Sequence, residues 1–318
     1  MKLATYKDAS RDGQLVVVSR DFSTAHYATG IANTLQQVLD DWRFMAPQLR
    51  DLSDLLNSGK ARHAFPFDPA HCMAPLARAY QWVSGPAYAS HVERLGRLPE
   101  AALLENPYAQ PLLRQGGSDC FLGPHDDVRV DSETSGIDIE AQLAVITGDV
   151  PLGASSEQAL DAVRLLVLAS DLCLRGMGAV QGRPATAFGP VAVTPDEAGD
   201  AWRQGRLHLS LNTTWNGRKV GLCDAGAGMT FHFGQLVSQL CKNRPVRAGS
   251  IVGAGPVSHP DWSQGYHCIA EKRAVETVDH GKPRTRFMQP GDTLRLDMKG
   301  QNGQSLFGAI EQEIKPLD

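Results

Sequence analysis

Residues 136–150 read GIDIEAQLAVITGDV and contain the strand pattern around which the rest of the chain can be placed. Side chains alternate between the two faces of a strand, so Asp138, Glu140 and Gln142 share one face and apolar residues occupy the other. The next four residues, 143–146, are all apolar, which indicates that the strand enters a core. Two interpretations of the polar face are open. It is either the solvated face of an edge strand, or it points into a site where other segments supply partners for Glu140.

The composition of the chain limits the kinds of partner that it can have. Its 318 residues include 31 basic and 35 acidic side chains, for a net charge of −4, with no long run of one charge. This balance argues against a nucleic-acid groove and against a membrane-binding face. We therefore expect its partners to be small molecules or further copies of the chain, with no nucleic acid and no membrane among them.

The cysteines and the first residues bear on the cellular compartment. Six scattered cysteines with no Cys-x-x-Cys pair indicate reduced thiols rather than a zinc site or a disulfide framework. Lys7, Asp8, Arg11 and Asp12 lie where a signal peptide needs its apolar run, and no later stretch approaches about 18 apolar residues. We therefore expect a soluble, cytoplasmic protein.

The first 70 residues have the pattern of a small α/β domain. Two apolar segments around a polar turn predict a hairpin, and helical spacing of apolar residues follows until Gly59. These segments are 3–6, 14–19, 31–39 and 49–56. Prolines between residues 65 and 75 mark the exit from this unit. The pattern predicts one domain over residues 1–70 and a second over residues 71–318.

Beyond this boundary the patterns are mostly those of strands. The segment 155–170 begins with a Ser-x-x-Gln capping box and predicts a helix, and 230–243 carries a second helical face. Asn216-Gly217 between two strand patterns is a strong hairpin signal. The predicted strands are 207–215, 218–222, 251–257, 267–278, 292–298 and 306–314. The fold class that follows is α+β, with a β-rich mixed main domain and few helices.

Several segments of the chain, taken in order, resemble the fumarylacetoacetate hydrolase family in its bacterial branch. They are AYASHVERLGRLP (87–99), PLLRQGGSDCFLGP (111–124), GIDIEAQLAVITGDVPLG (136–153), SDLCLR (170–175), GRPATAFGPVAVTPDEAG (182–199) and GSIVGAGPVSH (249–259). The resemblance runs from about residue 75 to the end. It implies a β-roll catalytic domain of that family behind a small N-terminal α/β domain, usually as a homodimer. It also implies chemistry on small 2-oxo or 1,3-dioxo acids.

The resemblance also implies a metal site. The family's strand normally reads Asp-aromatic-Glu-x-Glu-Leu, and its two glutamates, with the aspartate of an Asn-Asp-x-x-x-Arg segment, hold one Mg²⁺ or Mn²⁺. Oxygen ligands suit such a hard cation, whose open positions then bind the substrate. In this chain the ligands would be Glu140 and Asp171, but Gln142 stands where the second glutamate is usual. The site is therefore expected to be weakened, and dependence on Mg²⁺ or Mn²⁺ stays open.

Other positions depart from the family's pattern as well. Ser84 stands where some members have an aspartate, Arg114 where some have a tyrosine, Arg183 where some have a lysine, and Pro256 where some have a threonine. An arginine is always cationic and binds carboxylates through two parallel hydrogen bonds. We therefore expect Arg175 and Arg183 to act on the substrate's carboxylate or enolate oxygen. The predicted substrate-binding residues are Tyr88, Arg114, Gln115 and Pro256.

A histidine and a glutamate form the candidate proton-transfer pair. By resemblance to the fumarylacetoacetase branch, His91 from the irregular segment 75–124 pairs with Glu271 from a late strand and activates water. A carboxylate that orients an imidazole fixes its tautomer and raises its basicity, as a general base requires. The other interpretation is that His91 is a surface helix residue and Glu271 an ordinary strand carboxylate.

Three functions are compatible with these residues. The first is hydrolysis of a C–C bond in an acylpyruvate-like acid, with enolate stabilisation and with water activation by His91 and Glu271. The second is a metal-independent lyase, decarboxylase, isomerase or cyclase that uses the arginines of the same pocket. The third is a non-catalytic binder of an acidic metabolite.

Overall fold

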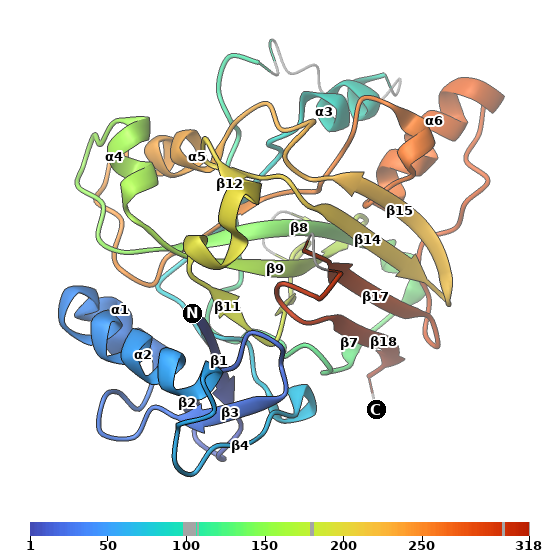
Figure 1. Ribbon diagram of the computed structural model, residues 1–318. Coiled ribbons are helices and arrows are strands. Elements are labelled where there is room, and N and C mark those ends of the chain that lie inside the picture. The colour runs from blue at the N-terminus through green and yellow to red at the C-terminus, as the bar shows by residue number, and fades with distance from the viewer. Residues whose placement is uncertain (98–105, 107, 179–180, 301–302, 318) are drawn as a thin grey trace.

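The structure is a computed structural model that describes residues 1–97, 106, 108–178, 181–300 and 303–317 (Figure 1). The described helices are α1 (Leu35–Asp40), α2 (Trp42–Asn57), α3 (Ala89–Gly96), α4 (Ser156–Asp161), α5 (Phe233–Leu240) and α6 (Ile269–His280). The described strands are β1 (Lys2–Tyr6), β2 (Gln14–Val18), β3 (Thr24–Tyr27), β4 (Phe65–Pro66), β5 (Trp82–Gly85), β6 (Arg114–Gly116), β7 (Val128–Val130), β8 (Ile137–Thr147), β9 (Val163–Leu174), β10 (Thr186–Phe188), β11 (Ala192–Val193), β12 (Trp202–Arg203), β13 (Arg206–Leu207), β14 (Ser210–Trp215), β15 (Arg218–Asp224), β16 (Ile251–Ala254), β17 (Thr293–Met298) and β18 (Ile310–Pro316).

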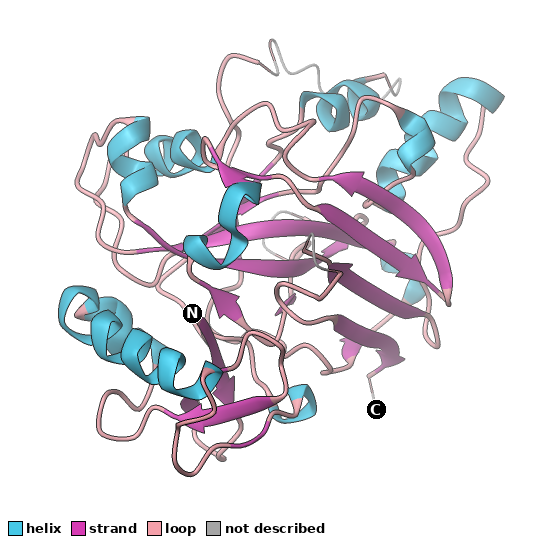
Figure 2. Cartoon of the chain, in the orientation of Figure 1, coloured by secondary structure: helices cyan, strands magenta, loops and turns pink. Residues whose placement is uncertain are grey.

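A long sheet runs through the molecule and a second, smaller sheet lies beside it (Figure 2). In the described part of the chain, the long sheet has the strand order β4-β3-β2-β1-β11-β9-β8-β16-β5-β6, with β10 also paired to β9. The smaller sheet has the order β15-β14-β17-β18-β7. Apolar side chains of both sheets form one hydrophobic cluster, which includes Leu168 of β9 and Leu296 of β17. The structure confirms a sheet-rich α+β fold with few helices.

The two longest strands, β8 and β9, form the centre of the long sheet. They pair antiparallel, and nearly every residue in them is buried. The register sets Glu140 opposite Asp171, so the two carboxylates are direct cross-strand neighbours. Because Asp138, Glu140 and Gln142 are all buried, the interpretation of this face as the solvated side of an edge strand is wrong.

Two segments differ from their predicted structure. Of the helix predicted over 155–170, only α4 (Ser156–Asp161) is helical, and strand β9 begins at Val163. The apolar run that continues there is a strand buried on both faces, which helical periodicity alone cannot distinguish from a buried helix. The strand predicted over 267–278 is helix α6 for most of its length, so Glu271 lies on a helix and not on a strand. The residues Glu-Lys-Arg-Ala in its first turns favour helix, and Gly281 ends it with a positive φ of 76°.

The N-terminal unit extends the long sheet. The predicted hairpin is confirmed as β1 and β2, and helix α2 lies against β2 and β3 (Figure 1). Strand β1 pairs with β11, so the first residues continue the same sheet as β8 and β9. The boundary near residue 70 stays a prediction. The second predicted hairpin is also present, with positive φ angles of 49° and 72° at Asn216 and Gly217 between β14 and β15. Each described helix is too short or too polar to cross a lipid bilayer.

Candidate active site

A cavity of about 770 Å³ opens where β6 and β9 end. Its described lining includes three arginines, Arg114, Arg175 and Arg183, together with Gln115 and Cys173. Arg114 and Gln115 come from β6, and the other residues come from the end of β9 and the segment after it. Arg114 has no ion-pair partner among the described residues, so its charge is available to an anionic ligand.

Two of these arginines bind the buried carboxylates of β8 and β9. Arg183 donates from Nη2 to Oε2 of Glu140 at 2.5 Å and from Nη1 to Oδ2 of Asp171 at 2.6 Å. Arg175 donates from Nη2 to Oε1 of Glu140 at 2.8 Å and from Nε to Oδ2 of Asp138 at 2.9 Å. The guanidinium of Arg183 therefore bridges the two carboxylates that face each other across the strands.

Neutral side chains complete the surroundings of Asp171. Thr186 donates to Oδ1 of Asp171 at 2.7 Å. The amide of Gln142 has its nitrogen 3.5 Å from Oδ2 of Asp171, and its oxygen accepts from Ser84 at 2.7 Å. Gln142 is packed against the backbone of β16, where a Cβ on Gly253 would lie 2.6 Å from its amide oxygen. Residue 142 thus occupies a closely fitted slot.

The pKa values of the two facing carboxyls move in opposite directions. Burial would raise the pKa of Glu140, but the charges of Arg175 and Arg183 outweigh it and lower that pKa to about 2. Burial raises the pKa of Asp171 to about 6 against the pull of Arg183, and the negative charge of Glu140 adds to the rise. Both carboxylates are therefore ionised at pH 7.

Glu140, Asp171 and Cys173 place their ligand atoms within 4.8 Å of one another, which is close enough for one metal ion. The donors, however, fit Mg²⁺ or Mn²⁺ poorly. Both oxygens of each carboxylate already accept from an arginine or from Thr186. Burial raises the pKa of the Cys173 thiol well above its ordinary value, and a neutral sulfur is a weak ligand for hard cations. The set as it stands suits a guanidinium better than either ion.

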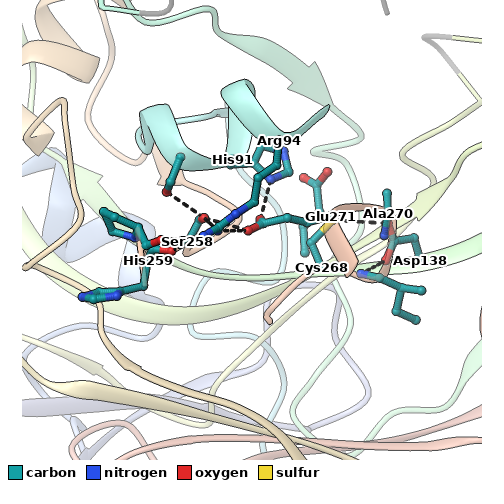
Figure 3. A network of polar contacts seen from close by, with 12 residues as sticks. His91, Arg94, Asp138, Ser258, His259, Cys268, Ala270 and Glu271 are labelled. Carbon is teal, nitrogen blue, oxygen red and sulfur yellow. Dashed lines mark hydrogen bonds and ion pairs between the residues drawn. The ribbon is translucent and has the colours of Figure 1, made fainter. Parts of the chain in front are cut away.

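The predicted proton-transfer pair is present and buried (Figure 3). Nδ1 of His91, on α3, lies 2.8 Å from Oε2 of Glu271, on α6. The other carboxylate oxygen of Glu271 accepts from Arg94 at 2.5 Å and from Ser258 at 2.9 Å. Burial would raise the pKa of Glu271, but the hydrogen bond and charge of His91, together with Arg94, hold it below the ordinary value. The charge of His91 also lowers the pKa of Glu140, which links this pair electrostatically to the carboxylate cluster.

Asp138 connects the carboxylate cluster to helix α6, a role that the sequence did not reveal. Its Oδ1 accepts from the backbone nitrogen of Ile269 at 2.7 Å, and its Oδ2 accepts from Ala270 at 3.0 Å and from Arg175. A carboxylate at the first amides of a helix satisfies unpaired donors and interacts favourably with the helix dipole. Asp138 thereby holds the helix that carries Glu271.

Comparison with protein families identifies the chain. A model of the fumarylacetoacetate hydrolase C-terminal domain matches residues 81–315. The chain belongs to the fumarylacetoacetate hydrolase family. A model of the fumarylacetoacetase N-terminal domain, type 2, matches residues 1–78. Membership places the protein among enzymes that are hydrolases or isomerases.

Individual members of the fumarylacetoacetate hydrolase family resemble the chain at low sequence identity. A 2,4-didehydro-3-deoxy-L-rhamnonate hydrolase of Sphingomonas sp. strain SKA58 is 24% identical over 232 residues, which span 67% of this chain and 73% of the relative. Maleylpyruvate hydrolase from Sphingobium sp. SYK-6, solved with manganese(II) and pyruvate, has a TM-score of 0.68 at 16% identity over 100% of both chains. The 2-hydroxyhepta-2,4-diene-1,7-dioate isomerase of Mycobacterium marinum has a TM-score of 0.61 at 16% identity, over 99% of this chain and 98% of that one. The two structural likenesses describe the fold.

The predicted site residues of this family member fall into three groups, one of which is the buried His91–Glu271 pair, which is not among the described lining of the cavity. Arg114, Gln115, Arg175 and Arg183 line the cavity, and Glu140, Gln142 and Asp171 form the network beneath it. Tyr88 is buried, with its hydroxyl donating to the carbonyl of Ala225 at 2.6 Å, and Pro256 is buried after Gly255. Neither is among the described lining of the cavity, so the substrate-binding roles predicted for these two residues have no support from the geometry.

Arg94, Ser258 and Thr186 belong to the site although the sequence did not assign them. Arg94 has a sequence signal, because it lies three residues after His91 on the same helix face. Ser258 and Thr186 have none, since their partners Glu271 and Asp171 are placed by the tertiary fold.

Proposed function

We propose that the protein is a hydrolase that cleaves a C–C bond in a small 2-oxo or 1,3-dioxo acid. The observation that carries the proposal is the buried His91–Glu271 pair, with 2.8 Å between imidazole nitrogen and carboxylate oxygen. The relatives support the class of substrate, because one hydrolyses a didehydro-deoxy sugar acid and another was solved with pyruvate, a 2-oxo acid.

The pair has the arrangement of a general base. Glu271 is ionised at neutral pH because hydrogen bonding and charge lower its pKa despite burial. An ionised carboxylate accepts the Nδ1 proton of His91, which leaves the lone pair of Nε2 available. Among the described residues, Nε2 of His91 has no hydrogen-bond partner. This nitrogen can therefore take a proton from water.

The hydrolytic reaction balances with these groups alone. Water gives a proton to Nε2 of His91, and its oxygen bonds to the carbonyl carbon that lies farther from the substrate's carboxylate. The bond from that carbon to the neighbouring CH₂ then breaks, and its electron pair stays on the 2-oxo acid fragment as an enolate. His91 returns the proton to the enolate carbon, which yields a 2-oxo acid and a carboxylic acid.

The arginines of the cavity supply the positive charge that this reaction needs. Arg114 is exposed in the cavity and suits the substrate's carboxylate. Arg175 and Arg183 also line the cavity, fixed by their carboxylate partners, and their charges favour an enolate oxygen as it forms. No step is assigned to Mg²⁺ or Mn²⁺.

A second candidate is isomerisation, in which His91 moves a proton between two carbons and no water is consumed. Two observations favour this candidate. One structural relative is an isomerase, and Gln142 replaces the usual second glutamate. Reaction of an acylpyruvate in ¹⁸O-labelled water separates the two. Hydrolysis places the label in the released carboxylic acid, and isomerisation releases no acid.

The proposal is tested by His91→Gln and Glu271→Gln on an acylpyruvate series. We expect each variant to lose about 10²- to 10⁴-fold in kcat, the range for a positioned general base. His71→Gln, which changes an exposed histidine at the end of a short 3-10 helix, is the matched control and should keep wild-type kcat. Wild-type turnover by His91→Gln would overturn the assignment of the base. Ligand-induced stabilisation with no product from any member of the series would instead indicate a binder of acidic metabolites.

The expectation of a homodimer in the cytoplasm stays a prediction, and multi-angle light scattering of the purified protein checks the oligomeric state.

A further inference from the structure

Arg183 occupies the centre of the carboxylate cluster. Its two terminal nitrogens lie 2.5 Å from Glu140 and 2.6 Å from Asp171, which face each other across β8 and β9. Its side chain is 10% exposed and that of Asp171 is fully buried, so the pair is shielded from competing water. This is the position between opposed carboxylates in which a bound cation would lie.

The charges and hydrogen bonds of the surrounding groups match one guanidinium at that position. Three carboxylates, Asp138, Glu140 and Asp171, meet two arginines, which leaves the cluster with a formal charge of −1. Gln142 and Thr186, which are neutral, also lie within hydrogen-bond distance of Asp171. Divalent ions need several anionic or water oxygens, whereas here each carboxylate oxygen of Glu140 and Asp171 already accepts a hydrogen bond.

We propose that the guanidinium of Arg183 is a built-in cation that takes the metal position of this site and excludes Mg²⁺ and Mn²⁺ from Glu140 and Asp171. A tethered guanidinium supplies one positive charge at fixed geometry and needs no ion from solution. The inference rests on the proposed function in one respect only, which is the place in the cavity where negative charge develops on the substrate. Its test measures metal binding, which does not require turnover.

The first measurement uses the wild-type protein. Elemental analysis after purification in buffer with Mn²⁺, and titration followed by the electron paramagnetic resonance signal of free Mn²⁺, should both show less than one tenth of an ion per chain. Near-stoichiometric Mn²⁺ in the wild-type protein would overturn the proposal. This measurement does not depend on any variant folding.

The second measurement removes the cation. Arg183→Met keeps a long side chain and frees one oxygen of each carboxylate, so Mn²⁺ affinity should rise at least tenfold over the wild type. Arg183→Met combined with Gln142→Glu adds a third anionic ligand and should bind more tightly still. Arg286→Met is the control, because Arg286 forks onto the single carboxylate of Asp292 outside the site. It should bind no more Mn²⁺ than the wild type.

Failure of this inference and failure of the proposed function give different results. If both Arg183 variants keep the wild-type circular dichroism spectrum and gain no Mn²⁺ affinity, the tethered-cation proposal is wrong, whatever the activity of His91→Gln. If Arg183→Met gains Mn²⁺ while His91→Gln keeps full turnover, the cation assignment stands and the base assignment falls.

Discussion

Arg114 differs from the two other arginines of the cavity. Its side chain is exposed and has no ion-pair partner among the described residues, whereas Arg175 and Arg183 are held by carboxylates. A charged hydrogen bond to a ligand carboxylate is worth about 1.5–3 kcal/mol. We therefore expect Arg114→Gln to raise KM by about 10- to 100-fold with little change in kcat, because the contact is made equally in ground and transition states.

Steady-state kinetics on the substrate found for the wild type checks this expectation. Arg114→Lys should be intermediate, because a lysine keeps the charge and loses the planar fork. An unchanged KM in Arg114→Gln would mean that the substrate carboxylate binds elsewhere in the cavity.

At the scale of residues, the sequence indicated which residues belong to the site more fully than it indicated which of them contact one another. Resemblance indicated Glu140, Asp171 and Arg175, and the register of β8 and β9 brings the two carboxylates together. The arginine at 183 was visible, but its position between two carboxylates was not, because a bridge depends on the path of the chain after β9. The spacing of Arg94 from His91 places both on one helix face, but the contact of Arg94 with Glu271 joins residues 177 positions apart and was not predictable from local pattern.

Helix α6 links the two halves of the site. Asp138 binds its first two amides and Arg175, and Glu271 follows two residues after Ile269. Asp138→Asn keeps the shape but places an NH₂ group where one of the oxygens accepts. Since a buried donor or acceptor without a partner costs about 1–3 kcal/mol, we expect the free energy of unfolding to fall by that amount.

The same substitution should lower kcat, because Glu271 shifts with its helix and no longer fixes His91. Urea denaturation and the pH dependence of kcat/KM measure the two effects. Asp131→Asn, at an exposed position, serves as the control. Loss of stability with an unchanged pH profile and kcat would show that Asp138 is structural only.

The two wrong predictions at the scale of elements have one cause. The local patterns of segments 155–170 and 267–278 carry no information about the strands and side chains that pack against them. The first becomes a strand because β8 offers a full set of backbone partners, and the second becomes a helix because Asp138 caps it from another strand. A partner far away in the sequence acts in both cases, and in α6 it adds to the local preference of Glu-Lys-Arg-Ala for helix. The hairpins were predictable because a turn at Asn216-Gly217 carries its own signal.

For the whole molecule, one sheet passes through the N-terminal unit and the main body. Apolar residues from both, among them Leu3, Leu15, Trp82 and Leu165, share one hydrophobic cluster. The length and alternation of the strands predicted a β-rich fold. The joining of β1 to β11 was not predictable, because two short strands in separate segments carry no pairing code.

The pH dependence of stability follows from several buried groups together. The pKa of His267 is lowered by burial to about 4, so its contribution is complete above pH 6.5 and is lost as the pH falls toward 4. The pKa of Asp171 is raised by burial to about 6, so the folded state binds a proton first and gains stability as the pH falls from 6 toward 3.8. These two contributions have opposite signs, so they offset each other as the pH falls from about 6 to 4.

Below this range the signs agree. Although burial opposes the shift, hydrogen bonds from the loop after α6 lower the pKa of Glu276 to about 2, and arginines lower that of Glu140 to about 2. Their stabilising contributions are complete above pH 4.5 and are lost as the pH falls toward 2. We expect the free energy of unfolding in urea to change little between pH 7 and 5 and to drop steeply below 4.5. A steady decline from pH 7 would contradict this balance.

The slot around Gln142 has a consequence for the charge of the site. A Cβ at Gly253 or Gly255 would collide with the side chain of Gln142, so the slot fits a side chain of this shape closely. Glutamine and glutamate have the same outline and differ in one terminal atom. An exchange of Gln142 for glutamate would therefore change the charge at this position without changing the packing around it.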